Sequence, residues 1–306
     1  MDVQELLAAI HSLASPDTRE LACGEPGHPA GHICLVAPGG ADLPTLLDEL
    51  SNWHGEPRTL VTGGHVAPAV TERTGLPLLA PWGEGLVEMR AWAFGGRWIG
   101  CGSVRTGDGV RLVMLIAERA APSLEELPED ASWVDRVVAV TGWEADRRDP
   151  IDWAAAEARL GTALPRDYKL LAELFGRGAF DGYLGVHLPD DSRSDLVRHA
   201  ERLAEWAAVH GNGLWEPHRL YPAPGGLLQW ASSEQADGFY WLTEGPDPDK
   251  WSILACEDDR TTYRFAGSTA EFVYRLLTDP QQPFSTARYF SAHWFRSYGS
   301  PEPADD

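Results

Sequence analysis

The segment from residue 23 to residue 34 gathers four side chains that can bind a metal ion. They occur in the order Cys23-x4-His28-x3-His32-x-Cys34, and cysteine sulfur and histidine nitrogen are ligands that zinc prefers in proteins. The segment contains no Cys-x2-Cys pair, and the glycine and proline residues between the four side chains are equally typical of a turn. We therefore interpret it as a turn without a bound metal and keep two alternatives, a structural zinc site and a cysteine nucleophile beside a histidine.

The other motifs that suggest chemistry are incomplete. Pro-Gly-Gly at 38–40 and Thr-Gly-Gly at 62–64 suggest phosphate-binding loops, but neither continues into the Gly-Lys-Ser/Thr sequence that holds phosphate and magnesium. The acidic runs at 190–191 and 257–259 are more typical of solvated turns than of a catalytic pair. The sequence thus predicts no catalytic residue and no cofactor, and we expect the protein not to be an enzyme.

Length and charge limit the number of domains and the kind of partner. The chain has 306 residues and a formal net charge of −21, and its length predicts two domains because ~100 to 200 residues is the usual size of one. Both halves hold more acidic than basic side chains, which argues against binding to nucleic acid or to an anionic membrane surface. A protein with a basic surface is the expected partner, and nothing in the sequence indicates the oligomeric state.

The N-terminus and the cysteine content predict a cytoplasmic protein. Asp2 and Glu5 stand where a secretory signal needs positive charge, and no apolar run approaches the ~20 residues that cross a bilayer. The four cysteines are too few to stabilise a chain of this size by disulfides, so we expect reduced thiols.

The periodicity of the N-terminal half predicts a small α+β domain with a β-meander. Helices are expected at 2–14, where Asp2 and Glu5 have the spacing of a capping box, and at 42–53. Strand-like runs follow at 33–37, 58–62, 85–94, 97–104 and 110–118. Glycine-rich turns separate the last three, which predicts an antiparallel arrangement. A further helix and a strand are expected within 123–140.

The C-terminal half predicts an α+β layer with a mostly antiparallel sheet bracketed by helices. Helices are expected at 153–160, 166–175, 195–210 and 269–277, and strands at 227–231, 238–243, 252–257 and 262–266. Ser194 and Ser268 are expected to cap the third and fourth of these helices. The aromatic stretch at 285–298 is expected to form another helix.

These elements predict a division of the chain into four parts. They are an N-terminal domain at 1–143, a linker at 144–150, a second domain at 151–280, and an aromatic helix with an acidic tail at 281–306. The function of the N-terminal domain stays open at this point.

A series of residues in the second half occurs in the order seen in a known family. It begins with Trp153, Glu157, Leu160-Gly161, Leu164-Pro165, Tyr168 and a Gly176-x-Gly178 turn. It continues with Gly225-Gly226-Leu227-Leu228-x-Trp230, Phe239-Tyr240-Trp241, Trp251 after an acidic loop, and Glu271-Phe272. Over 149–279 the chain thereby resembles a single SUKH domain of the Smi/Knr type. One departure is the order Asp237-Gly238 before the aromatic strand, where similar proteins often have Gly-Asp.

The resemblance implies a non-catalytic protein-binding role. Bacterial members of the superfamily are commonly immunity proteins that bind and neutralise secreted toxins, while eukaryotic relatives resemble signalling or wall-synthesis regulators. Immunity against a bacterial toxin, for instance a nuclease or a deaminase, is therefore the expected function, with a regulatory or scaffolding role as the alternative. A metal-dependent enzyme that uses the segment from Cys23 to Cys34 is a third hypothesis.

The expected contact residues for such a partner are acidic and aromatic side chains of the second half. The acidic ones are Asp181, Asp190, Asp191, Asp195, Asp237, Glu244, Asp247 and Asp249, and the aromatic ones are Tyr183, Trp215 and Tyr221. Exposed carboxylates would face the lysine and arginine side chains of a basic toxin and accelerate the encounter. A few partly buried aromatic side chains would supply most of the affinity.

Overall fold

The chain divides into two compact units, each of which is described by itself. The computed structural model describes residues 3–15, 20–35, 37–71, 74–120, 127–143, 150–191, 194–211, 213–257 and 261–299. The first unit consists of 1–123, 140–144 and 289–297, and the second unit of 124–139, 145–288 and 298–306. Most of the expected linker at 144–150 and the acidic tail at 301–306 lie outside the described residues.

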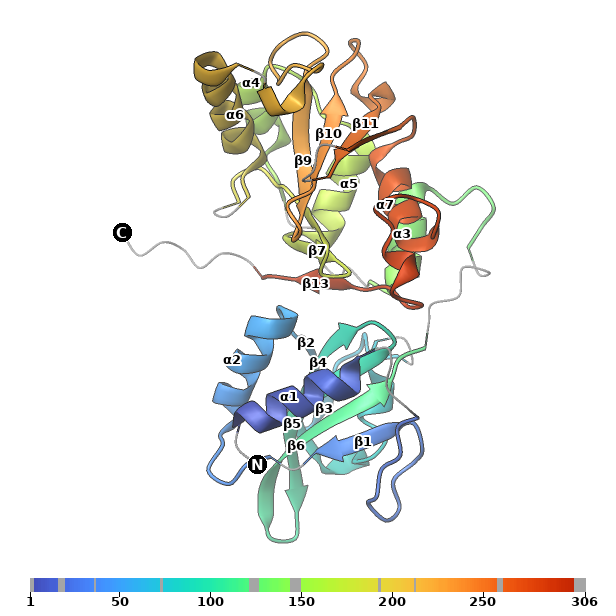
Figure 1. The fold of residues 1–306 in the computed structure, drawn as a ribbon. Helices are drawn as coiled ribbons and strands as arrows, with labels where there is room; N and C mark the ends of the chain where they lie inside the picture. Colours follow the sequence, from blue (N-terminus) through green and yellow to red (C-terminus); the bar gives the residue numbers. More distant parts are fainter. Residues whose placement is uncertain are drawn as a thin grey trace. The chain divides into compact units, whose positions relative to one another are not determined.

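A six-stranded antiparallel sheet forms the centre of the first unit, in the order β1-β6-β5-β4-β2-β3 (Figure 1). Its strands are β1 (His32–Leu35), β2 (Arg58–Thr62), β3 (His65–Val66), β4 (Leu86–Phe94), β5 (Arg97–Thr106) and β6 (Gly109–Glu118). The three long strands β4, β5 and β6 follow one another through tight turns, which confirms the predicted meander. The short strand β3 was not predicted, because two residues give no periodicity to detect.

Two helices cover one face of this sheet. They are α1 (Val3–Ala14) and α2 (Leu43–His54), and Figure 1 shows both on the same side of the strands. The Thr45 backbone N–H donates to Asp42 Oδ1 at 3.0 Å, which satisfies one of the free amides at the start of α2. Leu6, Ile10 and Leu50 pack there against strand residues such as Ile99. The two helices confirm the predictions for 2–14 and 42–53.

The opposite face of the first sheet is covered by chain without α-helix. Two short 3-10 helices, η1 (Leu76–Leu78) and η2 (Gly83–Gly85), lie in this region. Leu78 and Leu79 pack there with Trp98, Val113 and Leu115 from the strands. Because both faces of the sheet are covered, residues 113–117 of β6 form a continuous run of buried apolar side chains instead of alternating with polar ones.

The second unit combines helices with a second antiparallel sheet. Its strands β12-β11-β10-β9-β8-β7 lie side by side in that order. They are β7 (Gly178–Phe180), β8 (Leu184–Val186), β9 (Leu227–Ser233), β10 (Gly238–Leu242), β11 (Ile253–Cys256) and β12 (Thr262–Phe265). The helices are α4 (Trp153–Leu160), α5 (Arg166–Phe175), α6 (Leu196–His210) and α7 (Thr269–Thr278), with the short turns η3 (Gly213–Trp215), η4 (Pro248–Lys250) and η5 (Thr286–Arg288). The α+β class predicted for both halves is confirmed.

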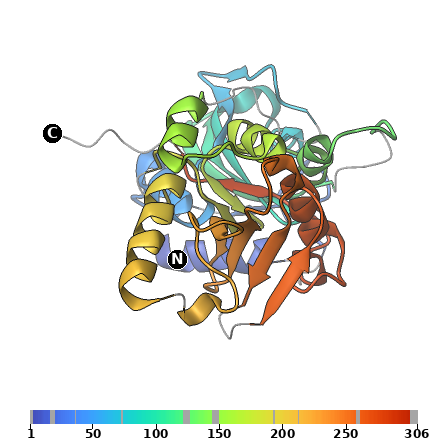
Figure 2. The ribbon, with the colours of Figure 1, turned by 90° about the horizontal axis from the view of Figure 1, so that it is seen from above.

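Helices lie on both faces of the second sheet (Figures 1 and 2). On one face, Trp241 of β10 contacts Tyr168 of α5 with ring centroids 4.8 Å apart, and Trp230 of β9 contacts Phe272 of α7 at 6.0 Å. On the other face, Tyr240 and Leu242 belong to a cluster into which α6 inserts Leu203. Alternation along β10 therefore divides the aromatic run between two apolar layers.

Two expectations for local structure need correction, and two short strands were missed. The cap of α6 is Asp195 and not Ser194, because Asp195 Oδ1 accepts the backbone N–H groups of Val197 and Arg198. Within 127–143 the chain forms helix α3 (Trp133–Thr141) and no strand. The strands β7 and β8 were not predicted, since three residues are too few for a periodic pattern.

The aromatic stretch at 285–298 is not the predicted helix. It contains the single turn η5 and the strand β13 (Phe295–Ser297), and residues 289–297 belong to the first unit. The neighbours Trp294 and Phe295 are both buried, and they pack against different aromatic side chains, Phe94 and Trp143 respectively. Successive side chains of an extended segment point to opposite sides, so tertiary contacts to both sides favour an extended backbone.

None of the helices in the described ranges combines the length and the apolar character that a bilayer crossing requires.

Candidate functional site

Four side chains of the first unit form a group that we call the cysteine–histidine cluster. Its members are Cys23, His28, His32 and Cys34. His32 and Cys34 are two positions apart on β1, so they point to the same side of the strand. Ile33 and Leu35 point to the other side and pack against the layer of α1 and α2. The alternation of β1 thus assigns its apolar residues to the core and its metal-binding residues to the opposite face.

The loop that precedes β1 supplies the other two members of the cluster. Cys23 and His28 lie between Leu21, which is buried, and the start of the strand. Gly27 and Gly31 have φ angles of +84° and +81°, which a residue with a side chain adopts at a cost. The Glu118 backbone N–H donates to the Gly31 carbonyl at 2.9 Å and fixes the end of the loop to the sheet. The glycines predicted to form a turn therefore fold this loop back over β1.

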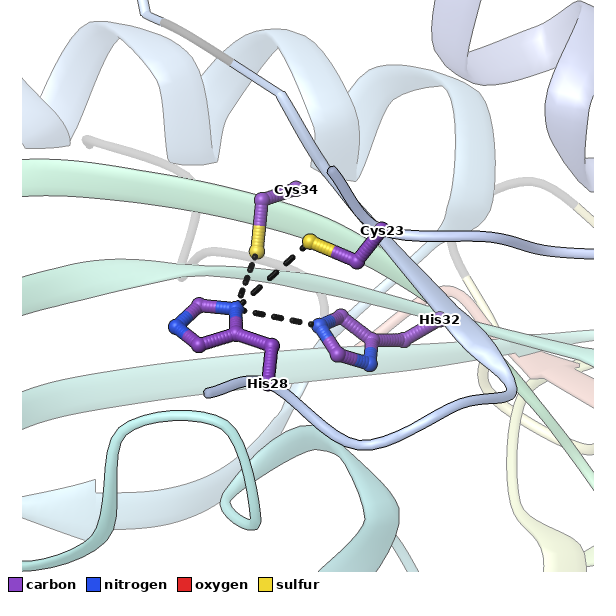
Figure 3. A group of neighbouring side chains, drawn as sticks. All are labelled: Cys23, His28, His32 and Cys34. Atoms are coloured by element: carbon purple, nitrogen blue, oxygen red, sulfur yellow. Dashed lines mark hydrogen bonds between the residues drawn. The ribbon is translucent and has the colours of Figure 1, made fainter. Parts of the chain in front are cut away.

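Close contacts in the cluster converge on one nitrogen atom, His28 Nδ1 (Figure 3). His32 Nε2 lies 3.3 Å from it, Cys34 Sγ lies 3.4 Å from it, and Cys23 Sγ lies 3.5 Å from it. One potential ligand atom from each residue lies within 4.8 Å of each of the others. His32 is only 1% exposed, and the other three side chains are half-buried.

A cation and a cavity lie next to the cluster. The Trp82 indole contacts the His28 ring edge-on, with centroids 4.8 Å apart, and the Arg111 guanidinium lies 5.0 Å from the centre of that indole. A cavity of about 270 Å³ is lined by Cys34, Trp82, Arg111 and Glu25 among others. Trp82 therefore limits the positions that the His28 ring can take.

Burial favours the uncharged forms of two cluster residues. Burial and the neighbouring His28 lower the pKa of His32, and the Pro29 carbonyl opposes this only in part. Burial and Cys23 raise the pKa of Cys34 to about 12. The imidazole of His32 thus has a free lone pair at neutral pH, whereas the Cys34 thiol must release a proton to bind a metal ion.

The cluster was predicted from the sequence as a turn, with zinc binding as an alternative. The structure brings the four side chains together. The signal that favours a site over a turn is the alternation His32-x-Cys34 within a strand, combined with the three-residue spacing between His28 and His32.

Comparisons with known proteins give no relative. No protein-family model, no curated protein and no solved structure matches this chain. The resemblance of the second unit to SUKH domains therefore depends on the order of its residues alone.

Three of the acidic residues expected to meet a partner are buried. Asp181 accepts a hydrogen bond from Thr286 Oγ1 at 2.6 Å, and Asp191 forms an ion pair with Arg177 at 3.2 Å. Asp237 accepts hydrogen bonds from the hydroxyl groups of Tyr183 and Ser233. These carboxylates are not exposed, so they do not form an accessible acidic surface. The Asp237-Gly238 departure from the family pattern falls in a turn that the Asp237 side chain anchors.

The remaining acidic residues lie closer to solvent, and several have partners within the second unit. Asp195 caps α6, Asp249 pairs with Arg166 at 2.5 Å, Asp247 pairs with Lys250 at 3.1 Å, and Glu244 pairs with Arg264 at 2.6 Å. Asp190 has a largely exposed side chain and lies 3.9 Å from Arg159. Exposed ion pairs of this kind contribute little to stability, so a cation of a partner protein can replace the internal cation at a low cost in free energy.

The expected aromatic contact residues have different positions in the second unit. The Tyr221 hydroxyl donates to the Leu160 carbonyl, and Tyr183 is bonded to Asp237. Trp215 is half-buried, donates from Nε1 to the Tyr240 hydroxyl at 3.1 Å, and contacts the Trp206 ring at 5.4 Å.

An apolar patch around Trp215 was not predicted. We call it the α6 patch, and it consists of Trp206, Val209, His210 and Trp215. Trp206 stacks on His210 and is 38% exposed, while Val209 is 77% exposed. The helical pattern assigns Trp206 to a core face, but the buried residues of α6 all lie in its N-terminal half, and Trp206 in the C-terminal half stays partly in solvent.

A buried histidine lies on the side of the second sheet that α6 covers. His187 follows β8, its Nε2 lies 3.2 Å from Ser232 Oγ, and its ring centroid lies 5.2 Å from that of His199 on α6. Burial, helped by His199, lowers the pKa of His187 to about 3, and Asp191 opposes the shift. The folded protein therefore holds this imidazole neutral through mildly acidic pH.

We expect the free energy of unfolding of the second unit to fall as the pH drops below ~6.5. The unfolded chain takes up a proton at His187 near that pH, whereas the folded unit does so only near pH 3. The linked loss is about 2 kcal/mol between pH 7 and pH 5. Urea unfolding at several pH values measures this loss, and His187→Asn should remove it, which makes the plot of unfolding free energy against pH less steep. His65→Asn, at an exposed site, is the control, and an equal slope in all three proteins would contradict the assignment.

Proposed function

We propose that this chain is a non-catalytic protein that acts by binding another protein, with immunity against a bacterial toxin as the favoured role. The supporting observation is that the residues carrying the SUKH resemblance serve as scaffold. Tyr168, Trp241 and Phe272 are almost fully buried in one core of the second unit. A series of residues that builds a core instead of a reactive site is consistent with a family that functions through its surface.

The α6 patch and the exposed acidic side chains are the surface that suits this role best. Trp206 and Trp215 are large, partly exposed side chains of the kind that supplies most of the affinity in protein interfaces. The net charge of −21 would attract a partner with a basic surface and accelerate association at low ionic strength. Association that slows as salt rises is therefore part of the proposal.

Two other functions are less well supported. A regulatory or scaffolding role uses the same surface and differs only in the partner. A metal-dependent enzyme would need an open coordination position, and the cysteine–histidine cluster offers four protein ligands, which is the number that closes a tetrahedral shell.

The identity of the partner is the decisive test of the proposed function. The full chain, tagged and expressed in its native host, is cross-linked and purified, and bound proteins are identified by mass spectrometry. The immunity role predicts enrichment of a secreted toxin encoded near this gene, and restored growth when toxin and chain are produced together in a heterologous bacterium. Enrichment of a regulatory protein, with no effect on toxicity, would favour the alternative.

Once the partner is purified, the α6 patch can be tested directly. We expect Trp206→Ala to weaken binding by about thirtyfold or more, because truncation of a central aromatic residue typically costs about 2 kcal/mol or more. Leu170→Ala changes a similarly exposed apolar residue on α5 and is the matched control. Calorimetry with both variants measures the difference, and equal affinities would exclude the α6 patch as the binding surface.

A further inference from the structure

We propose that the cysteine–histidine cluster binds one zinc ion as a four-coordinate structural centre of the first unit. This inference concerns the unit for which the sequence predicts no function, and it does not depend on the proposed binding role.

Three of the six distances between the ligand atoms agree with a tetrahedral zinc site. With Zn–S bonds of about 2.3 Å and Zn–N bonds of about 2.0 to 2.1 Å, a tetrahedron has sulfur and nitrogen about 3.6 Å apart and two nitrogens about 3.4 Å apart. The two sulfur–nitrogen distances are 3.5 Å and 3.4 Å, and the nitrogen–nitrogen distance is 3.3 Å. Each of these three lies within about 0.2 Å of the tetrahedral value, which is the tolerance for a credible site. The other three pairs of ligand atoms lie within 4.8 Å of each other, so they must draw closer by up to about 1 Å to complete the tetrahedron around a zinc ion.

Hydrogen bonding alone does not account for the three contacts on His28. A ring nitrogen has either one N–H group or one lone pair, so Nδ1 can make one good hydrogen bond. Three atoms nevertheless lie within 3.5 Å of it. A central cation accounts for the convergence, because each of the four atoms then directs its lone pair toward the ion and none has to bond to another.

The ligand types point to zinc and to a structural role. Two thiolates and two imidazoles form a soft donor set that suits zinc and is unsuited to magnesium or calcium, which bind oxygen. Four protein ligands fill the tetrahedral shell and leave no position for a water molecule or substrate. The edge-on contact between Trp82 and His28 holds one ligand ring in place, as contacts beyond the ligands commonly do in metal sites.

The expected effect of the ion is to fix the loop before β1. This loop returns over an edge strand that pairs only with β6 among the described strands. A zinc ion would join Cys23 and His28 of the loop to His32 and Cys34 of the strand. Zinc binding would therefore stabilise the folded loop, because the unfolded chain holds no preformed site.

Metal content and a spectroscopic probe test the proposal on the full chain. The protein is purified with reduced thiols, its metals are removed with a chelator, and it is titrated with Zn²⁺ and, separately, with Co²⁺. We expect one zinc ion per chain. We also expect the Co²⁺ protein to show the intense visible absorption of a tetrahedral site and a thiolate-to-cobalt charge-transfer band in the near ultraviolet.

Two variants connect these signals to the cluster. Cys34→Ser should lose the charge-transfer intensity of one thiolate and weaken zinc binding by more than the ~10-fold that loss of an outer-shell partner typically costs. Cys256→Ser changes a half-buried cysteine of the second unit and should retain both stoichiometry and spectrum. If Cys34→Ser fails to fold, the Co²⁺ spectrum of the unchanged protein decides alone, because it reports thiolate ligands directly.

Several outcomes would overturn the proposal. They are a reduced protein that takes up no zinc, a Co²⁺ spectrum without thiolate bands, an unchanged zinc affinity in Cys34→Ser, and a marked preference for iron over zinc. A disulfide between Cys23 and Cys34 in protein isolated under non-oxidising conditions would also overturn it. Hydrogen exchange of 20–35 supplies an independent readout, since zinc should slow exchange there and leave β9 and β10 of the second unit unchanged.

Discussion

Replacing Arg119 with methionine should destabilise the first unit by about 3 to 5 kcal/mol. Arg119 is only 5% exposed, and its guanidinium donates to the carbonyls of Gly95, Thr141 and His293. These three residues belong to the three separate chain segments that make up the first unit. Methionine fills much of the volume but leaves three buried acceptors without their donors, and each lost bond to a charged donor is worth about 1.5 to 3 kcal/mol before losses by non-additivity.

Hydrogen exchange during urea unfolding measures this loss unit by unit, because peptides from β5 and β10 report on different units. Arg105→Met is the matched control, since Arg105 lies on β5 with an exposed side chain, and its effect should stay within about 0.5 kcal/mol. Arg119→Lys should fall between the two, because a lysine retains the charge but not the planar array of donors. Equal stability of Arg119→Met and Arg105→Met would show that the three segments are joined in another way.

Trp241→Ala should have a comparable effect on the second unit, with a loss of about 3 to 5 kcal/mol. The Trp241 side chain is fully buried and lies against both Tyr168 and Trp230. Its Nε1 also donates to Thr269 Oγ1 at 3.0 Å, at the start of α7. Truncation would leave a large cavity between β10 and the helices α5 and α7, and the Thr269 hydroxyl would lose its partner.

A second substitution separates the contribution of the Trp241 side-chain volume to the free energy of unfolding from the contribution of its hydrogen bond. Trp241→Phe keeps most of the apolar volume and loses the bond to Thr269, so a loss of about 1 to 2 kcal/mol is expected. Trp206→Ala removes a partly exposed tryptophan from the same unit and should cost clearly less than Trp241→Ala. Chemical denaturation followed by exchange in β9 and β10 compares all three, and a similar loss for the two alanine variants would contradict the role assigned to the core tryptophan.

The sequence by itself determined the class of the fold and most of its elements. The capped helices α2 and α7 begin after Asp42 and Ser268 as their sequences predict, because capping depends on residues within one turn. The meander of β4, β5 and β6 was likewise predictable, since apolar runs separated by short glycine turns allow few other arrangements. Local signals of this kind need no knowledge of the rest of the chain.

The candidate sites depended much more on the tertiary structure. Asp181, Asp191 and Asp237 look like surface acids in the sequence, and only the packing shows that each is buried against a specific partner. The α6 patch, by contrast, combines the exposed C-terminal half of α6 with Trp215 from the following turn. Exposure is decided by what packs against a residue, and no local pattern contains that information.

The C-terminal stretch and the cysteine–histidine cluster also depend on tertiary contacts that local sequence does not reveal. Trp294 and Phe295 form no helix, because aromatic contacts with residues 200 and 152 positions earlier in the chain outweigh their local preference. Sequence spacing named the four members of the cluster, but it favoured a turn and left a metal site only as an alternative. The fold of the loop over β1 brings two sulfur and two nitrogen atoms within 4.8 Å of one another, and that proximity is a property of the tertiary structure alone.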